Sequence, residues 1–155
     1  MKWVTRERAK VDRIACPWLI SRFVDPTAEF LFVPSDRVHE VASKEGALPF
    51  DVPGVELTHY QEGGEERVSF DAIIRARGLT DRALLDLAEI VRTADAKHVT
   101  RPRAEGSGLE AAAIGFRSIA GDDHENMRLQ FPLYDALYAY CRGRIEEGGR
   151  LERRG

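Results

Sequence analysis

The chain has 155 residues, 43% of them hydrophobic and 32% charged, and its formal net charge is −3. This balance is typical of one globular domain with its own core. The negative net charge disfavours general nucleic-acid binding, which requires a basic surface. No segment reaches the roughly 20 apolar residues of a membrane span, and the N-terminus lacks the apolar part of a signal peptide. We therefore expect a cytoplasmic protein with Cys16 and Cys141 reduced.

The first predicted elements are a strand, a helix and a second strand. Lys2–Arg6 carries bulky side chains that favour a short strand. Pro17 favours a helix that begins there, with Cys16 at or near its N-cap, and Pro26 ends it. Glu29–Val33 is a near-continuous apolar run between two prolines, which predicts a buried strand.

Three helices are predicted in the middle of the chain, each opened by a polar capping residue. Glycine closes the first two, and the third carries apolar residues at helical spacing. The segment before residue 60 is predicted to be irregular or extended, and the segment after it to be a polar, glycine-rich surface loop. The predicted caps are Ser35 or Asp36, Ser69 and Thr80, the glycines are Gly46 and Gly78, and the irregular segments are 48–57 and 61–67.

The last third of the chain is predicted to be helical after a loop over residues 95–108. One helix covers 109–120, a second starts at Asp122 or Asp123, and a third starts at Pro132 and ends near Arg142. Residues 143–155 are charged and glycine-rich, which predicts a flexible tail. The whole pattern predicts an α+β fold, a mainly helical single domain over residues 1–142 with a small β-sheet.

The residues around Cys16 form the first candidate site. A thiol at a helix N-terminus is favoured as thiolate, which would make Cys16 a redox or catalytic residue. Arg13 beside it is suited to bind an oxyanion. The alternative is structural: Cys16 is a small core residue and Asp12 pairs with Arg13 or Arg22.

The acidic motif over residues 121–125 forms the second candidate site. Asp123, His124 and Glu125 are possible metal ligands, and His59 from an irregular segment is expected to complete a nitrogen and oxygen donor set. Such a set suits Zn²⁺, Fe²⁺, Mn²⁺ or Ni²⁺ without choosing among them, and Glu125 could then act as a catalytic general base. The alternative is that Asp122 and Glu125 form a helix capping box with no metal.

The remaining candidates have simpler interpretations. His39 and His98 are expected to face solvent, and Tyr134 and Tyr138 to belong to the core. Asp135 lies on their partly apolar helix and needs a partner, either an arginine or a metal-bound histidine. Asp12 is likewise expected to support the metal ligands. Motifs of the common nucleotide-binding proteins and serine hydrolases are missing from the sequence.

Several short motifs occur in an order that is found in a known family. They lie at residues 3–6, 11–20, 29–34, 49–57, 59, 69–71, 122–125 and 134–138. Together they resemble the chromate-resistance protein B family, in its C-terminal-type domain. The resemblance implies a stress-response role in chromate resistance. Because the motifs begin at residue 3, we expect an isolated domain, to which the DNA-binding role of longer members does not carry over.

Two main functional hypotheses follow from the residues and the resemblance together. The first is an accessory or sensor domain that binds a divalent transition metal and chromate. The second is a metal-dependent enzyme, hydrolytic or redox, that uses the cluster of His59, His124 and acidic residues. Redox chemistry at Cys16 and a purely structural scaffold are further alternatives. The expected partners are the metal ion, chromate and a second copy in a homodimer, with no membrane and no nucleic acid bound by this chain alone.

Overall fold

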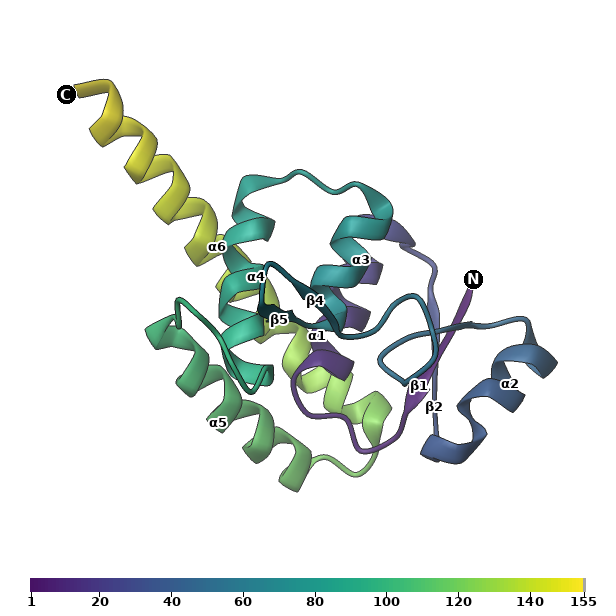
Figure 1. The fold of residues 1–155 in the computed structure, drawn as a ribbon. Coiled ribbons are helices and arrows are strands. Elements are labelled where there is room, and N and C mark those ends of the chain that lie inside the picture. Colours follow the sequence, from purple (N-terminus) through teal and green to yellow (C-terminus); the bar gives the residue numbers. More distant parts are fainter. Residues whose placement is uncertain (155) are drawn as a thin grey trace.

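The computed structural model describes the backbone of residues 1–154 and the side chains through residue 150. It is mainly helical, with a small parallel sheet on one side (Figure 1). The strands are β1 (Lys2–Arg6), β2 (Glu29–Val33), β3 (Leu48–Pro49), β4 (Tyr60–Glu62) and β5 (Glu65–Arg67). The helices are α1 (Asp12–Leu19), α2 (Val38–Glu45), α3 (Ser69–Arg77), α4 (Arg82–Asp95), α5 (Ala104–Ile119) and α6 (Asp123–Arg154). The predicted α+β class and single domain are confirmed.

The main sheet has the strand order β2-β1-β3, with both neighbours parallel to the central strand. The predicted strands Lys2–Arg6 and Glu29–Val33 are confirmed, and they pair along their full lengths. Because parallel strands need crossover connections, α1 joins β1 to β2 and α2 joins β2 to β3. After β1 the chain forms β2 on one side of it. After β2 the chain crosses back and forms β3 on the other side of β1.

The two faces of this sheet are covered by different helices. Trp3 belongs to the large core shared with α1, α3, α4, α5 and α6, whereas Val4 belongs to a smaller core under α2. Successive strand side chains point to opposite faces, so two neighbouring residues supply both cores. Figure 1 accordingly shows α2 on one side of β1 and β2, and α1 on the other.

The predicted start of the first helix is wrong. α1 begins at Asp12, five residues before Pro17, and Cys16 lies inside the helix and not at its N-cap. Pro17 lies inside this helix and has no backbone N–H to donate, so α1 lacks one backbone hydrogen bond at that position. The chain then continues as a π-helical turn over Ile20–Val24. The helical segment therefore ends before Pro26, as predicted.

The middle of the chain contains the predicted helices, but the N-cap position of α2 is Arg37 and that of α3 is Val68, so the predicted caps Ser35 or Asp36 and Ser69 are wrong. The segment 61–67, expected as a loop, is the antiparallel hairpin of β4 and β5. Its turn, Gly63-Gly64, has positive φ at both residues, as two-residue hairpin turns require. Asp81 caps α4 by accepting from the backbone N–H of Leu84, one residue after the predicted cap Thr80. The predicted glycine ends of α2 and α3, Gly46 and Gly78, are confirmed.

The C-terminal region forms two helices where three were predicted. α5 begins five residues earlier than expected, and α6 runs without interruption through Pro132 and past Arg142. The far part of α6 projects from the rest of the molecule (Figure 1). The backbone of 143–154 is therefore helical, while the expected flexibility of this tail stays a prediction and Gly155 lies outside the described residues. In the described chain, no helix combines the length and apolarity needed to cross a membrane.

Candidate functional site

A polar cavity of about 310 Å³ lies at the carboxyl ends of β1 and β3. Asp12 follows β1 and Asp51 follows β3, so both carboxylates stand at this edge of the sheet. In open parallel sheets ligands bind outside the carboxyl ends of the strands, and residues that follow β1 and β3 line this cavity. The topology therefore places the cavity where an α/β protein is expected to hold its ligand.

The imidazole of His59 is surrounded by carboxylates in this cavity. Its Nε2 lies 3.4 Å from Oδ2 of Asp12, 3.4 Å from Oδ1 of Asp51 and 3.3 Å from Oδ2 of Asp95. Ligand atoms of Asp12, His59 and Asp95 all lie within 4.8 Å of one another. Among the residues that the structure describes, these three form the group suited to share a metal ion.

The three contacts of His59 Nε2 are longer than the usual hydrogen bond of a charged pair. A single Nε2–H can point at one acceptor, and charge-assisted N–H···O bonds are usually about 2.7–2.9 Å long. In a tetrahedral site with bonds of about 2.0–2.1 Å, neighbouring ligand atoms stand roughly 3.3–3.4 Å apart. The contacts of His59 Nε2 are therefore long for charge-assisted hydrogen bonds, and the group of Asp12, His59 and Asp95 could hold a metal ion.

The other ring nitrogen of His59 is oriented by Glu66. Nδ1 lies 3.2 Å from Oε1 of Glu66, which stands on β5 of the adjacent hairpin. Glu66 also accepts a hydrogen bond from the backbone N–H of Lys97, so its carboxylate is fixed from both sides. A carboxylate on one imidazole nitrogen leaves the other nitrogen free to bind a metal, which is the usual support of histidine ligands.

Asp12 is buried and serves the fold as well as the cavity. Its two oxygens accept hydrogen bonds from the backbone N–H groups of Ser69 and Phe70, 2.7 and 3.1 Å away, at the start of α3. Asp12 therefore caps a helix 57 residues further along the chain. Neither Arg13 nor Arg22, its expected partners, pairs with it in the described structure.

Asp51 lines the cavity from the segment that follows β3. It has a positive φ of 54°, a backbone conformation that is rare outside glycine and is retained mainly where surrounding contacts impose it. Ser69 Oγ donates to Oδ1 of Asp51, and the guanidinium groups of Arg6 and Arg13 approach Oδ2 at 3.2 and 3.4 Å. Burial disfavours the charged form, but the hydrogen bonds from His59 and Ser69 and the charge of Arg13 hold the pKa of Asp51 below its usual range.

The carboxylates also control the protonation of His59 and of one another. Hydrogen bonding to Asp12, Asp51 and Asp95 raises the pKa of His59 far above its ordinary value, so the ring holds a proton at neutral pH when no cation is bound. Burial, with the charges of Asp51 and Asp95, raises the pKa of Asp12 to about 7. A metal ion that bound to His59 and Asp12 would displace the protons of both groups.

The predicted acidic motif lies outside this cluster. The oxygens of Asp123 accept from the backbone N–H groups of Arg8 and Ala9, so Asp123 anchors the loop between β1 and α1. Asp122 caps α6 by accepting from the backbone N–H of Glu125 at 2.8 Å. His124 is exposed, with its ring edge-to-face against Phe32. Asp122 and Asp123 line a separate hollow, and neither they nor His124 and Glu125 belong to the group around His59 in the described residues.

Cys16 is unsuited to act as a reactive thiolate. Its thiol is fully buried and lies 3.4 Å from Oδ1 of Asp12. Burial and the charge of Asp12 raise the pKa of Cys16 well above its ordinary value. The premise of the thiolate hypothesis, a thiol at a helix N-terminus, is therefore wrong, and the interpretation of Cys16 as a small core residue agrees with the structure.

We expect neither thiol to react in the folded protein at about pH 8. Cys141 is also buried, and burial together with its hydrogen bond to Asp86 raises its pKa to about 12. Titration with an aromatic disulfide reagent should show no fast reaction in buffer and reaction of both thiols in denaturant. A thiol that reacts in buffer as fast as in denaturant would contradict the burial of that residue.

The remaining predicted residues have structural partners. Asp135 accepts from Trp18 Nε1 at 2.8 Å and forms a two-point ion pair with Arg22, so the arginine partner is the one observed. Tyr134 is fully buried and Tyr138 packs against Trp18, as expected for core residues. His39 and His98 are exposed, also as expected.

Sequence reasoning missed Asp95 and Glu66. Asp95 is the last residue of α4 and follows Ala88 and Val91 on the apolar face. A negative charge at a helix C-terminus is unfavourable against the helix dipole, and an acid on an apolar stripe needs a partner, so two signals were present. Glu66 could have been found from the Gly63-Gly64 turn, which predicts a hairpin that brings 66 beside the segment containing His59.

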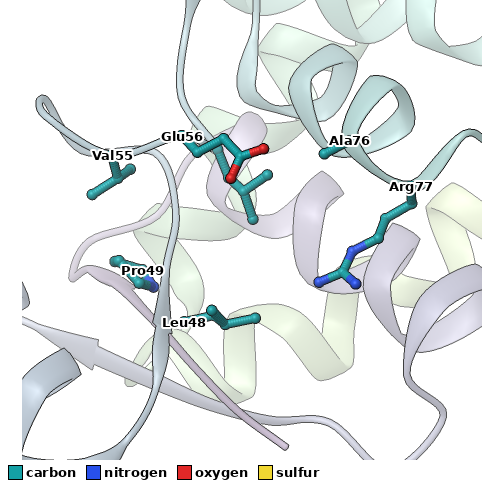
Figure 2. A pocket seen from close by; sticks show the side chains of 7 residues that line it. Leu48, Pro49, Val55, Glu56, Ala76 and Arg77 are labelled. Atoms are coloured by element: carbon teal, nitrogen blue, oxygen red, sulfur yellow. The ribbon is translucent and has the colours of Figure 1, made fainter.

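A larger hollow lies elsewhere, between β3 and α3. It measures about 540 Å³ and is lined by Leu48, Pro49, Val55, Glu56, Leu57, Ala76 and Arg77. Figure 2 shows its two charged side chains, Glu56 and Arg77, extending from different elements without converging on one point. A binding site usually combines an apolar pocket with a few convergent polar groups, so the smaller cavity around His59 is the stronger candidate.

The fold is an α+β domain with a polar cavity and a candidate metal-binding group at the carboxyl edge of its parallel sheet. Residues 3–141 match the family described as "ChrB, C-terminal domain", and the chain belongs to this family. The chain is 35% identical over 140 residues to "Protein ChrB" of Cupriavidus metallidurans. The matched region covers 90% of this chain and 40% of that protein, so the chain spans less than half of its relative. No solved structure matches the chain.

Proposed function

We propose that this chain is a chromate-resistance domain that binds a divalent transition metal ion through Asp12, His59 and Asp95. Membership of the ChrB C-terminal domain family supports the first part of the proposal. The second part depends on one observation: ligand atoms of Asp12, His59 and Asp95 lie within 4.8 Å of one another, with His59 Nε2 3.4 Å from Oδ2 of Asp12 and 3.3 Å from Oδ2 of Asp95.

The charges of the cluster favour a cation of charge two. Asp12, Asp95, Asp51 and Glu66 bring four carboxylates to one imidazole, and Arg6 and Arg13 balance Asp51. One imidazole with carboxylate oxygens suits Zn²⁺, Fe²⁺, Mn²⁺ or Ni²⁺, which accept mixed nitrogen and oxygen ligands. A bound ion would polarise or activate a molecule placed next to it in the cavity.

An ion held by Asp12, His59 and Asp95 would have three protein ligands and would keep an open side for a further molecule. Structural zinc sites are usually closed by four protein ligands, whereas sites that act on a further molecule keep a position open. This open side supports an accessory or sensor role in which a small ligand is recognised. It equally favours the alternative, a metal-dependent enzyme, and the acids available as general base are Asp51 and Glu66 and not the distant Glu125.

Calorimetric titration of the ion-free protein with Zn²⁺ or Mn²⁺ tests the proposal. We expect about one ion per chain, with protons released from His59 and Asp12, and an affinity that rises up to tenfold per pH unit for each proton displaced. The sign follows from the raised pKa values of both groups, because protons compete with the ion at low pH. Asp95→Asn should weaken binding at least tenfold. Absence of binding, or binding that neither pH nor Asp95→Asn changes, would refute the proposal.

A further inference from the structure

The hollow between β3 and α3 combines an apolar lining with two charged side chains. Five of its seven lining residues are apolar, and Glu56 and Arg77 carry the charges. Its volume of about 540 Å³ lies within the range of roughly 300–1,000 Å³ that small-molecule sites occupy. The apolar residues are Leu48, Pro49, Val55, Leu57 and Ala76. This lining is suited to a ligand with an apolar body, unlike the polar lining of the cavity around His59.

The two charges of the hollow have no partners of opposite sign. In the part of the chain that the structure describes, neither Glu56 nor Arg77 forms an ion pair or a side-chain hydrogen bond. The guanidinium of Arg77 lies over the ring of Trp3, 5.6 Å from its centroid. This cation–π contact uses none of the five N–H donors of the arginine. Figure 2 shows Glu56 and Arg77 at separate places around the hollow, so a ligand could use both only if its own charges stood apart.

The strand beside the hollow, β3, is at the edge of its sheet and presents a backbone acceptor there. Phe50 donates its backbone N–H to the C=O of Val4 on β1 at 3.0 Å, so the C=O of Pro49 before it points to the free edge. Pro49 has no N–H, and β3 is only two residues long, so no long strand can add to this edge. The edge therefore offers an acceptor to a single N–H group of a short ligand.

We propose that this hollow binds a short apolar peptide with free ends, a dipeptide or tripeptide. The carboxylate of the peptide pairs with Arg77, its ammonium group pairs with Glu56, and its side chains pack on the apolar lining between them. A peptide N–H can donate to the C=O of Pro49. A free amino acid carries both charges on one carbon and does not span two charges that stand apart. No metal ion takes part, so the inference is independent of the metal site.

The test is calorimetric titration of the chelator-treated protein with leucyl-leucine, its N-acetyl derivative, its C-terminal amide and free leucine. The variants are Glu56→Gln and Arg77→Gln, both at exposed positions, and circular dichroism checks their folding. The matched controls are Glu147→Gln and Arg128→Gln, which remove the same charges from exposed positions that line none of the described hollows. Because no metal is present, the outcome does not depend on the proposed metal site.

We expect the wild type and the controls to bind leucyl-leucine with a Kd below about 1 mM, and each blocked derivative about tenfold more weakly. Arg77→Gln should bind leucyl-leucine about tenfold more weakly than the wild type, yet bind the amide as well as the wild type does. Glu56→Gln should show the same pattern with the N-acetyl derivative. The inference is overturned if the wild type does not bind leucyl-leucine, if free leucine binds as tightly, or if the variants match their controls.

Discussion

His59→Ala should abolish stoichiometric metal binding while the protein stays folded. His59 supplies the only nitrogen donor of the candidate group. Its Nε2 lies 3.3–3.4 Å from an oxygen of each of the three surrounding carboxylates. Its side chain is about one-third exposed, so truncation leaves no sealed cavity in the core. Loss of one of three ligands commonly weakens binding by several orders of magnitude, because the carboxylates then lack the geometry for a transition metal.

The measurement is elemental mass spectrometry of tag-free protein after reconstitution, with circular dichroism as the check of folding. His124→Ala is the matched control, since His124 is an exposed histidine that packs on Phe32 and contacts none of the cluster. We expect full metal content in His124→Ala and background content in His59→Ala. Equal loss of metal in the two variants would contradict the site described here and restore the acidic motif near His124 as the ligand source.

Arg92→Met should be the most destabilising of the single substitutions considered. Arg92 on α4 donates two hydrogen bonds to Asp71 on α3, 2.7 and 3.0 Å long, and both side chains are buried. Asp71 also accepts from the backbone N–H of Val68, which caps α3. Removing one partner of a buried pair leaves an uncompensated charge and costs about 3–5 kcal/mol, or a fall in Tm of roughly 6–20 °C for a domain of this size.

Methionine keeps most of the buried aliphatic stem of Arg92, so the loss reports on the charge and the hydrogen bonds. Arg82→Met, at an exposed position on the same helix, is the control and should change Tm by no more than about 1–2 °C. Thermal unfolding followed by circular dichroism gives both values. If Arg92→Met and Arg82→Met unfolded at the same temperature, the Asp71–Arg92 pair would not contribute to the joining of α3 and α4.

Local elements were predictable because their signals are local. The strands Lys2–Arg6 and Glu29–Val33 are short apolar segments with clear ends, and Gly46 and Gly78 end helices through the left-handed conformation that glycine adopts easily. Helix starts were less predictable. Asp12 begins α1, but its carboxylate accepts hydrogen bonds at the N-terminus of α3. The residue that caps α3 therefore lies in a different helix.

The candidate site could be predicted only in part, since it depends on contacts between distant segments. His59 was identified from its chemistry, and Asp12 was expected to support it, but Asp95 and Glu66 come from α4 and β5. The motif of Asp123 and His124 offered four adjacent polar groups, which is a strong local signal. The fold uses it to cap α6 and to hold the loop after β1, because adjacent side chains on a helix diverge.

The double use of Asp12 restricts how the chemistry of this fold can change. A substitution that removes its carboxylate would take away a candidate ligand and also leave the first amides of α3 without their acceptor. Substitution of His59 or Asp95 would therefore remove metal binding with a smaller loss of stability, because neither side chain caps a helix. Relatives that have lost metal binding are therefore expected to keep Asp12 for its structural role. The presence of Asp12 alone does not indicate that a relative binds a metal ion.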